Sequence, residues 1–168
     1  MSADSTLTRD RLRERLSYDE RTGEFTHLTA NSMRKAGHRA GCTNGGGYRS
    51  IMVDGTIYQA HRLAWLYAYG TWPSNVIDHI NGDRTDNRLS NLRVVTTAGN
   101  SQNHHSARAD SLSGLKGVSR KKDGRWFARI TVDGNRLFLG HFDTAEQAHS
   151  AYVEAKRQMH PWWVEQVA

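Results

Sequence analysis

The stretch VIDHINGDRTDNRLSNLRVVTTAGNSQN, residues 76–103, decides the fold of the middle of this chain. An apolar strand candidate at residues 76–79 is followed by a polar loop rich in Asn, Asp and Gly. A second strand candidate at residues 92–96 leads into a short helix that ends near residue 103. Asp78 and His79 close the first strand, where nothing in the apolar pattern requires a carboxylate or an imidazole. We predict a strand-loop-strand-helix unit with polar chemistry at the end of its first strand.

The polar residues of this unit match the needs of phosphodiester hydrolysis, which requires a base, a group that orients it and a Lewis acid. His79 is the candidate base, because an unperturbed imidazole is largely neutral at pH 7. Asn91 on the opposite strand is the candidate acceptor for the Nδ1 proton, which leaves Nε2 to act as the base. Asp78, together with an oxygen such as that of Asn100, is expected to hold a hard divalent cation. Since adjacent strand residues point to opposite faces, a bend is needed for Asp78 and His79 to serve one site.

Several neighbouring polar residues also have simpler interpretations. Asp83 and Asp86 are expected to close the loop through bonds to its backbone rather than to act in catalysis. His61, within an aromatic helix expected at residues 60–69, is interpreted as a packed or capped histidine, with a DNA contact as the alternative. His104 and His105 are expected to be a solvated pair beyond the last helix.

Composition narrows the functional class. The 168 residues include 23 Lys and Arg against 17 Asp and Glu, a net charge of +6 that favours a polyanionic partner. No run of about 18 apolar residues is present, which excludes a membrane-spanning helix. The single cysteine, Cys42, excludes an internal disulfide and a thiolate-rich zinc cluster. The first residues lack a secretion signal, so we expect a cytoplasmic protein whose metal would be held by oxygen and nitrogen.

We expect the α+β fold class, divided into three modules and a linker. Residues 1–59 are predicted to form a small α+β module, with a helix at 8–16, a strand at 23–28 and a hairpin that turns at Asp54-Gly55. Residues 60–104 contain the strand-loop-strand-helix unit. The remaining boundaries are a linker at 105–114 and a module at 115–160.

The last module is predicted to be a three-stranded antiparallel sheet, with strands at 116–119, 126–132 and 136–142, packed on a helix at 144–159. Residues 116–142 contain seven Lys or Arg against two Asp. Alternation places Arg125, Phe127 and Arg129 on one face of the sheet and apolar residues on the other. Such a basic face suits the major groove of DNA. The candidate DNA contacts are Arg120, Lys121, Lys122, Arg125, Trp126, Arg129, Arg136 and Phe138.

The pattern from Asp78 to Asn103, preceded by His61-Arg62-Leu63-Ala64-Trp65, resembles the HNH nuclease family, and specifically the phage and intron-encoded HNH homing endonucleases. The resemblance implies a ββα-metal finger with His79 as general base, Asp78 and Asn100 as ligands of one divalent metal, and Asn91 as the orienting residue. Asn100, where other members have His, favours Mg²⁺ or Mn²⁺ over zinc. The absence of flanking Cys-x-x-Cys pairs implies that no structural zinc is bound.

The C-terminal module resembles the plant ethylene-response-factor (APETALA-type) DNA-binding domain. The resemblance rests on residues 117–120, Trp126-Phe127-Ala128-Arg129-Ile130, residues 139–142 and residues 144–152. It implies that strand Arg and Trp residues read the major groove. Because Ser119 and Phe138 stand where the plant proteins often have Arg and Trp, no base preference is transferred.

Together these features predict a Mg²⁺-dependent HNH homing endonuclease that nicks or cuts double-stranded DNA, as a monomer or a homodimer. The resemblance implies products with 5′-phosphate and 3′-hydroxyl ends. The alternative is a DNA-binding regulator whose HNH portion is only a scaffold. A non-specific nuclease of the toxin type is disfavoured, since a dedicated reader module would be superfluous.

Overall fold

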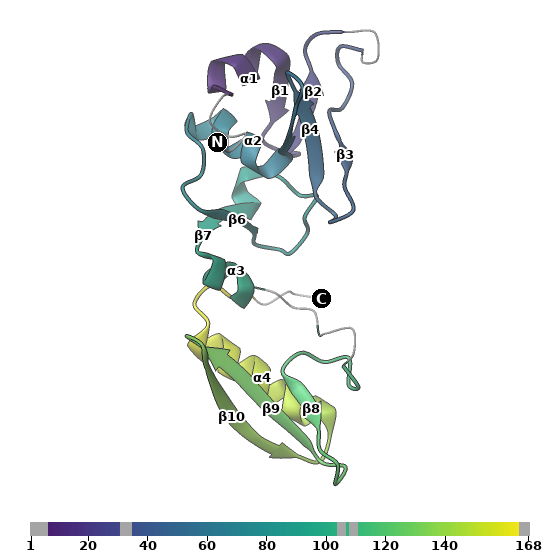
Figure 1. Ribbon diagram of the computed structural model, residues 1–168, viewed down its shortest axis with the longest axis vertical. Helices are drawn as coiled ribbons and strands as arrows, with labels where there is room; N and C mark the ends of the chain where they lie inside the picture. Colours follow the sequence, from purple (N-terminus) through teal and green to yellow (C-terminus); the bar gives the residue numbers. More distant parts are fainter. Residues whose placement is uncertain (1–6, 31–34, 104–106, 108–110, 165–168) are drawn as a thin grey trace. The chain divides into compact units, whose positions relative to one another are not determined.

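The computed structural model describes residues 7–30, 35–103, 107 and 111–164. The chain divides into two compact units, Met1–Thr97 and Ala98–Ala168, which are described separately below (Figure 1). Among the described residues, no helix has the length and apolar character needed to cross a membrane. The mixed helices and antiparallel sheets confirm the α+β class.

The N-terminal unit begins with α1 (Arg9–Arg15), whose N-cap is Thr8: its hydroxyl accepts a hydrogen bond from the backbone N–H of Arg11. The helix leads directly into β1 (Leu16–Asp19), which pairs antiparallel with β2 (Glu24–His27). The sequence pattern predicted β2 but not β1. A four-residue strand that continues straight from a helix carries too little alternation to be recognised.

A second sheet follows, in the order β3-β4-β5, formed by β3 (Cys42–Thr43), β4 (Arg49–Val53) and β5 (Thr56–Gln59). The predicted two-residue turn joins β4 and β5. Asp54 and Gly55 both have positive φ, 47° and 83°, as a type I′ hairpin turn requires.

The chain then forms α2 (Ala60–Tyr69), which matches the predicted helix and ends at Gly70 in the left-handed conformation. The predicted strand pair is present as β6 (Val76–His79) and β7 (Leu92–Val95), with a short 3₁₀ helix, η2 (Leu89–Asn91), directly before β7.

One hydrophobic core joins these elements except β3, whose two residues are exposed. It runs from Leu7 and Phe25 through Ile51 and Leu63 to Leu92. Described residues on both sides of the boundary expected near residue 59 belong to this one core. The boundary itself stays a prediction. Half of the linker expected at 105–114 lies outside the described residues, as do His104 and His105.

The C-terminal unit starts within α3 (Thr97–Gln102) and contains the sheet β10-β9-β8, formed by β8 (Val118–Arg120), β9 (Trp126–Val132) and β10 (Asn135–Phe142). The helix α4 (Ala145–Met159) lies along one face of this sheet (Figure 1). A capping box between Thr144 and Gln147 starts the helix. Ala148 and Tyr152 on this helix are buried against the sheet, in agreement with the predicted packing.

Lys156 on α4 provides a test of this packing. Its side chain is 2% exposed, and its Nζ lies 5.1 Å from the ring centroid of Trp163. Burial, reinforced by the charge of Lys116, lowers the pKa of Lys156 to about 7.

Between pH 7 and the ordinary lysine pKa, the unfolded chain binds a proton that the folded chain does not, so stability should rise with pH in this window. We expect the free energy of unfolding to increase by about 1 kcal/mol or more from pH 7 to pH 9. In Lys156→Met this increase should disappear. Thermal or urea unfolding of the full chain measures both slopes, and equal slopes would contradict the assignment.

Candidate active site

The candidate site is built at the end of β6. The register pairs Asp78 with Arg93 and His79 with Leu92 on β7. Ile77, on the same strand, is part of the core, and this anchors the strand that ends in the two polar residues. Asp78 and His79 are themselves buried, at 6% and 5% exposed.

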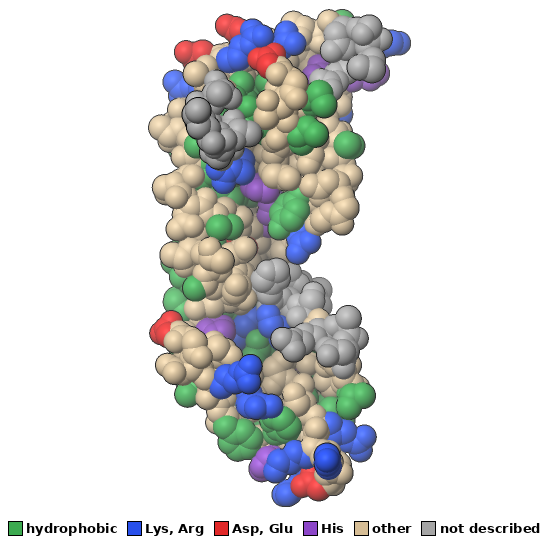
Figure 2. Space-filling view, in the orientation of Figure 1, with side chains coloured by type: hydrophobic (Ala, Val, Ile, Leu, Met, Phe, Trp, Pro, Cys, Tyr) green, Lys and Arg blue, Asp and Glu red, His purple; other side chains and the backbone are tan. Residues whose placement is uncertain are grey.

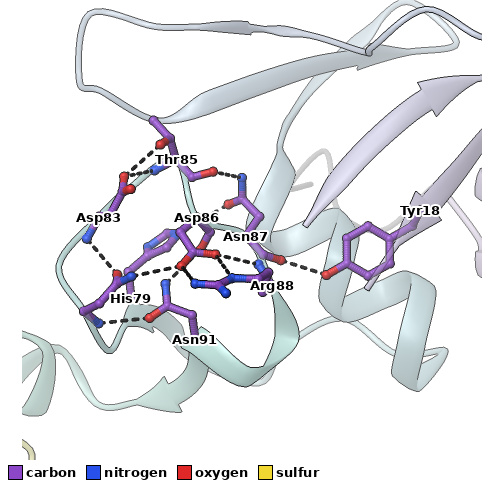
Figure 3. Close-up of polar contacts among 9 residues, drawn as sticks. Tyr18, His79, Asp83, Thr85, Asp86, Asn87, Arg88 and Asn91 are labelled. Carbon is purple, nitrogen blue, oxygen red and sulfur yellow. Dashed lines mark hydrogen bonds and ion pairs between the residues drawn. The ribbon is translucent and has the colours of Figure 1, made fainter. Parts of the chain in front are cut away.

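The His79 imidazole contacts the side chain of Asn87, with 3.3 Å between Nε2 and Oδ1 (Figure 3). An amide oxygen only accepts, so this contact places the ring proton on Nε2. Burial lowers the pKa of His79, and the Asn87 contact partly opposes this effect. The ring is therefore neutral at pH 7, as a general base must be.

Asn91 occupies a different position from the one expected. Its Oδ1 accepts from the backbone N–H of Asn81 at 2.9 Å, and its Nδ2 donates to the backbone carbonyl of Asp86 at 2.9 Å. Both contacts close the loop between β6 and β7 (Figure 3). Asn91 ends the short helix η2, so its side chain faces the loop backbone, and the amide that touches the His79 ring is that of Asn87.

The loop acids have the structural roles expected of them. Oδ1 of Asp83 accepts from the backbone N–H and the hydroxyl of Thr85, both at 2.8 Å. Asp86 accepts from Asn81 Nδ2 at 2.9 Å and from Arg88 Nε at 2.8 Å. The bond to Arg88 is the main cause of the lowered pKa of Asp86.

Asp78 forms a buried ion pair that sequence reasoning missed. Nε and Nη2 of Arg93 lie 2.9 and 2.8 Å from the same carboxylate oxygen, Oδ2. Arg93 stands directly opposite Asp78 in the strand register, so the pairing of β6 with β7 is the signal that could have revealed it.

Aromatic rings surround the imidazole on its other side. His61 from α2 meets His79 edge to face, with ring centroids 5.1 Å apart. Tyr48 lies 5.4 Å from His61 and 5.9 Å from His79, and Arg84 lies over the Tyr48 ring. His61 is 8% exposed, and burial lowers its pKa to about 3. Of the two interpretations of His61, the structure supports the packed histidine.

The hairpin of β1 and β2 supports the loop from the N-terminal side. The Tyr18 hydroxyl donates to the backbone carbonyl of Asn87 at 2.8 Å (Figure 3). Gly23, in the turn of the hairpin, lies so close that an added Cβ would stand 2.4 Å from the backbone nitrogen of Arg88. Sequence reasoning missed this support, because the contacts join residues more than 60 positions apart.

The second expected metal ligand, Asn100, lies on α3 in the C-terminal unit. Its position relative to Asp78 stays a prediction. Among the described residues, no group of three or more His, Cys, Asp or Glu side chains is arranged to hold a metal. Asp78 and Asn100 therefore stay predicted ligands.

The six candidate DNA-contacting cations of the C-terminal unit are all exposed, as is Phe138. They are Arg120, Lys121, Lys122, Arg125, Arg129 and Arg136. Trp126 differs, because it packs against the cluster between the sheet and α4, and Arg120 lies over its ring at 5.4 Å. A DNA contact of Trp126 stays a prediction.

The chain is similar to known proteins in sequence and in structure. Residues 58–102 match a family described as HNH endonuclease. Over 102 residues the chain is 31% identical to Protein 3.8 of Escherichia phage T7, covering 60% of this chain and 83% of that protein. It is also similar to a solved structure described as "DNA binding and cleavage by the HNH homing endonuclease I-HmuI", with 21% identity, a TM-score of 0.41 and coverage of 80% of this chain and 75% of the other. The family match contains all four candidate catalytic and metal-binding residues.

The contact between the β1-β2 hairpin and the loop can be tested by adding one methyl group. Gly23 and Gly37 have similar φ values, 74° and 78°, but an added Cβ meets backbone atoms only at Gly23. We expect Gly37→Ala to cost about 1–2 kcal/mol through backbone strain. Gly23→Ala should cost at least about 1–3 kcal/mol more, because it overpacks the contact. Urea unfolding compares the two variants, and equal losses would contradict the close approach.

Proposed function

The chain belongs to the HNH endonuclease family, and on this premise we propose that it is a divalent-metal-dependent endonuclease of the homing type that hydrolyses double-stranded DNA. The burial of His79, next to the buried Asp78 at the end of β6 and within the residues that match the HNH family, is the observation that carries the proposal. Cleavage would occur at this site and recognition on the C-terminal sheet, in the cytoplasm of a phage's host cell.

His79 acts as the general base in this proposal. The contact to Asn87 keeps the proton on Nε2, so Nδ1 is the ring nitrogen that takes a proton from the attacking water. With Asn91 as the orienting residue, the sequence predicted the other tautomer, in which Nδ1 carries the proton and Nε2 acts as the base. The edge-to-face contact with His61 limits the tilt of the ring.

Asp78 and Asn100 would hold the metal. Their oxygen atoms suit a hard cation such as Mg²⁺ or Mn²⁺, and no thiolate contributes. Arg93 holds the Asp78 carboxylate in place through Oδ2. When bound, a divalent cation supplies charge stabilisation at the phosphoryl group and at the departing 3′ oxygen. The products would carry 5′-phosphate and 3′-hydroxyl ends.

Replacing the base tests the reaction itself. We expect His79→Ala to lower the cleavage rate by at least about 10²-fold, the usual contribution of a general base, while DNA affinity stays within a few-fold. His38→Ala, which removes an exposed histidine of the same unit, should keep full activity. Cleavage is measured on supercoiled plasmid and phage genomic DNA with Mg²⁺ or Mn²⁺, with a chelator as control.

The outcomes of this assay separate the functions. Open circles indicate the nick expected of a monomer, and linear product indicates the double-strand cut expected of a homodimer. Full activity of His79→Ala would overturn the assignment of the base. If the wild-type chain binds DNA but cuts none of these substrates with either metal, the DNA-binding regulator becomes the better interpretation.

Asn87 is proposed as the residue that positions the base. We expect Asn87→Ala to slow single-turnover cleavage by about tenfold or more at saturating DNA, with little change in affinity. Because Asn87 acts through the imidazole, the same change should have no further effect in a His79→Ala background. An equal loss in both backgrounds would show a general structural role instead.

A further inference from the structure

An aromatic cluster on the outer face of the C-terminal sheet is not explained by phosphate contacts. It consists of Phe127, Phe138 and His141. The ring centroids of Phe138 and His141 are 4.9 Å apart. The centroid of Phe127 lies 6.5 Å from that of Phe138 and 6.4 Å from that of His141. Phe138 is 56% exposed, so the cluster presents apolar surface on the side of the sheet away from α4.

A β-bulge assembles this cluster. Phe138 and His141 are three residues apart on β10, and in a regular strand their side chains would point to opposite faces. The register shifts between Phe138 and Gly140, so that Phe138 pairs with Arg129 while His141 pairs with Phe127. Directly opposed residues share a face, and the shift therefore brings all three rings together. Gly140 has a φ of 131°, a conformation that favours glycine.

Cations border the cluster. The Arg129 guanidinium lies over the Phe127 ring, with 4.6 Å from Cζ to the ring centroid, and Lys121 Nζ lies 3.2 Å from His141 Nε2. These five residues line an open concavity of about 300 Å³. In Figure 2, hydrophobic side chains lie beside Lys, Arg and His side chains near the bottom of the view, at the end of the C-terminal unit.

The chemistry of this surface indicates what it meets. Its cations are opposite in charge to DNA phosphates and can bind them. Exposed phenyl rings contribute nothing to such a purely electrostatic contact. In the major groove, the apolar group that base edges offer is the C5 methyl of thymine. An apolar concavity with a cationic border fits a thymine methyl flanked by phosphates.

Building on the proposed DNA-cleaving function, we propose that the aromatic cluster contacts thymine C5 methyl groups in the major groove. The cluster thereby biases the enzyme toward target sites with thymine at the positions it covers. The cations around it supply affinity that does not depend on sequence, and the rings supply the selectivity.

The experiment removes only the methyl group. Two pools of random-sequence duplexes are made with the same templates, one with thymine and one with uracil, and are bound to the full chain in the presence of chelator. We expect the thymine pool to bind at least about threefold more tightly, since each methyl contact buries one apolar carbon. In the Phe127→Ala, Phe138→Ala double variant the two pools should bind equally.

Arg136→Ala is the matched control. Arg136 is exposed and pairs with Thr131 on the same face of the sheet, but it does not line the concavity. This change should weaken the binding of both pools equally, reduce the salt dependence and keep the preference for thymine. Gly140→Ala should reduce the preference by disturbing the bulge.

Equal binding of the two pools by the wild-type chain would overturn the methyl contact while leaving the proposed endonuclease function intact. A thymine preference that survives in the double variant would place the contact elsewhere. If neither pool binds, the DNA-binding function itself is contradicted.

Discussion

The burial of one imidazole is the constraint on which the candidate site depends. A buried histidine at the end of a strand must be satisfied by its neighbours, and in this protein Asn87 meets one nitrogen while His61 and Tyr48 pack against the ring. Asn87 is itself 1% exposed and bonded to the loop backbone at Thr85. The ring, the amide and the loop therefore hold one another in a single arrangement.

The N-terminal segment contributes to this arrangement by contacting the loop that carries Asn87. The β1-β2 hairpin bonds to the backbone of Asn87 through Tyr18 and packs on the next residue through Gly23. α2 carries His61 to the other side of the ring and also holds the shared core. The strand pair β6-β7 is thus part of a larger unit, because it shares one hydrophobic core with the β1-β2 hairpin and α2.

The C-terminal unit differs, because its sheet presents an open outer face with exposed side chains rather than a buried polar site. Its apolar residues are divided between a core against α4 and an exposed ring cluster, and the bulge at Gly140 controls this division. The same register shift that aligns His141 with Phe127 returns Phe142 to the inner face beside Trp126.

Sequence by itself determined the features that depend on neighbouring residues. The end of α2 at Gly70, the turn at Asp54-Gly55 and the start of α4 at Thr144 follow from local conformational preferences. The position of Asp78 and His79 as neighbours at the end of a strand was likewise visible in the sequence pattern. Only the tertiary structure decided that the amide beside the His79 ring is that of Asn87 rather than Asn91, and that Tyr18 and Gly23 contact the loop that carries Asn87. It also decided that a bulge brings Phe138 and His141 to one face. Alternation and turn chemistry describe a strand alone, whereas these contacts depend on which distant segment packs beside it.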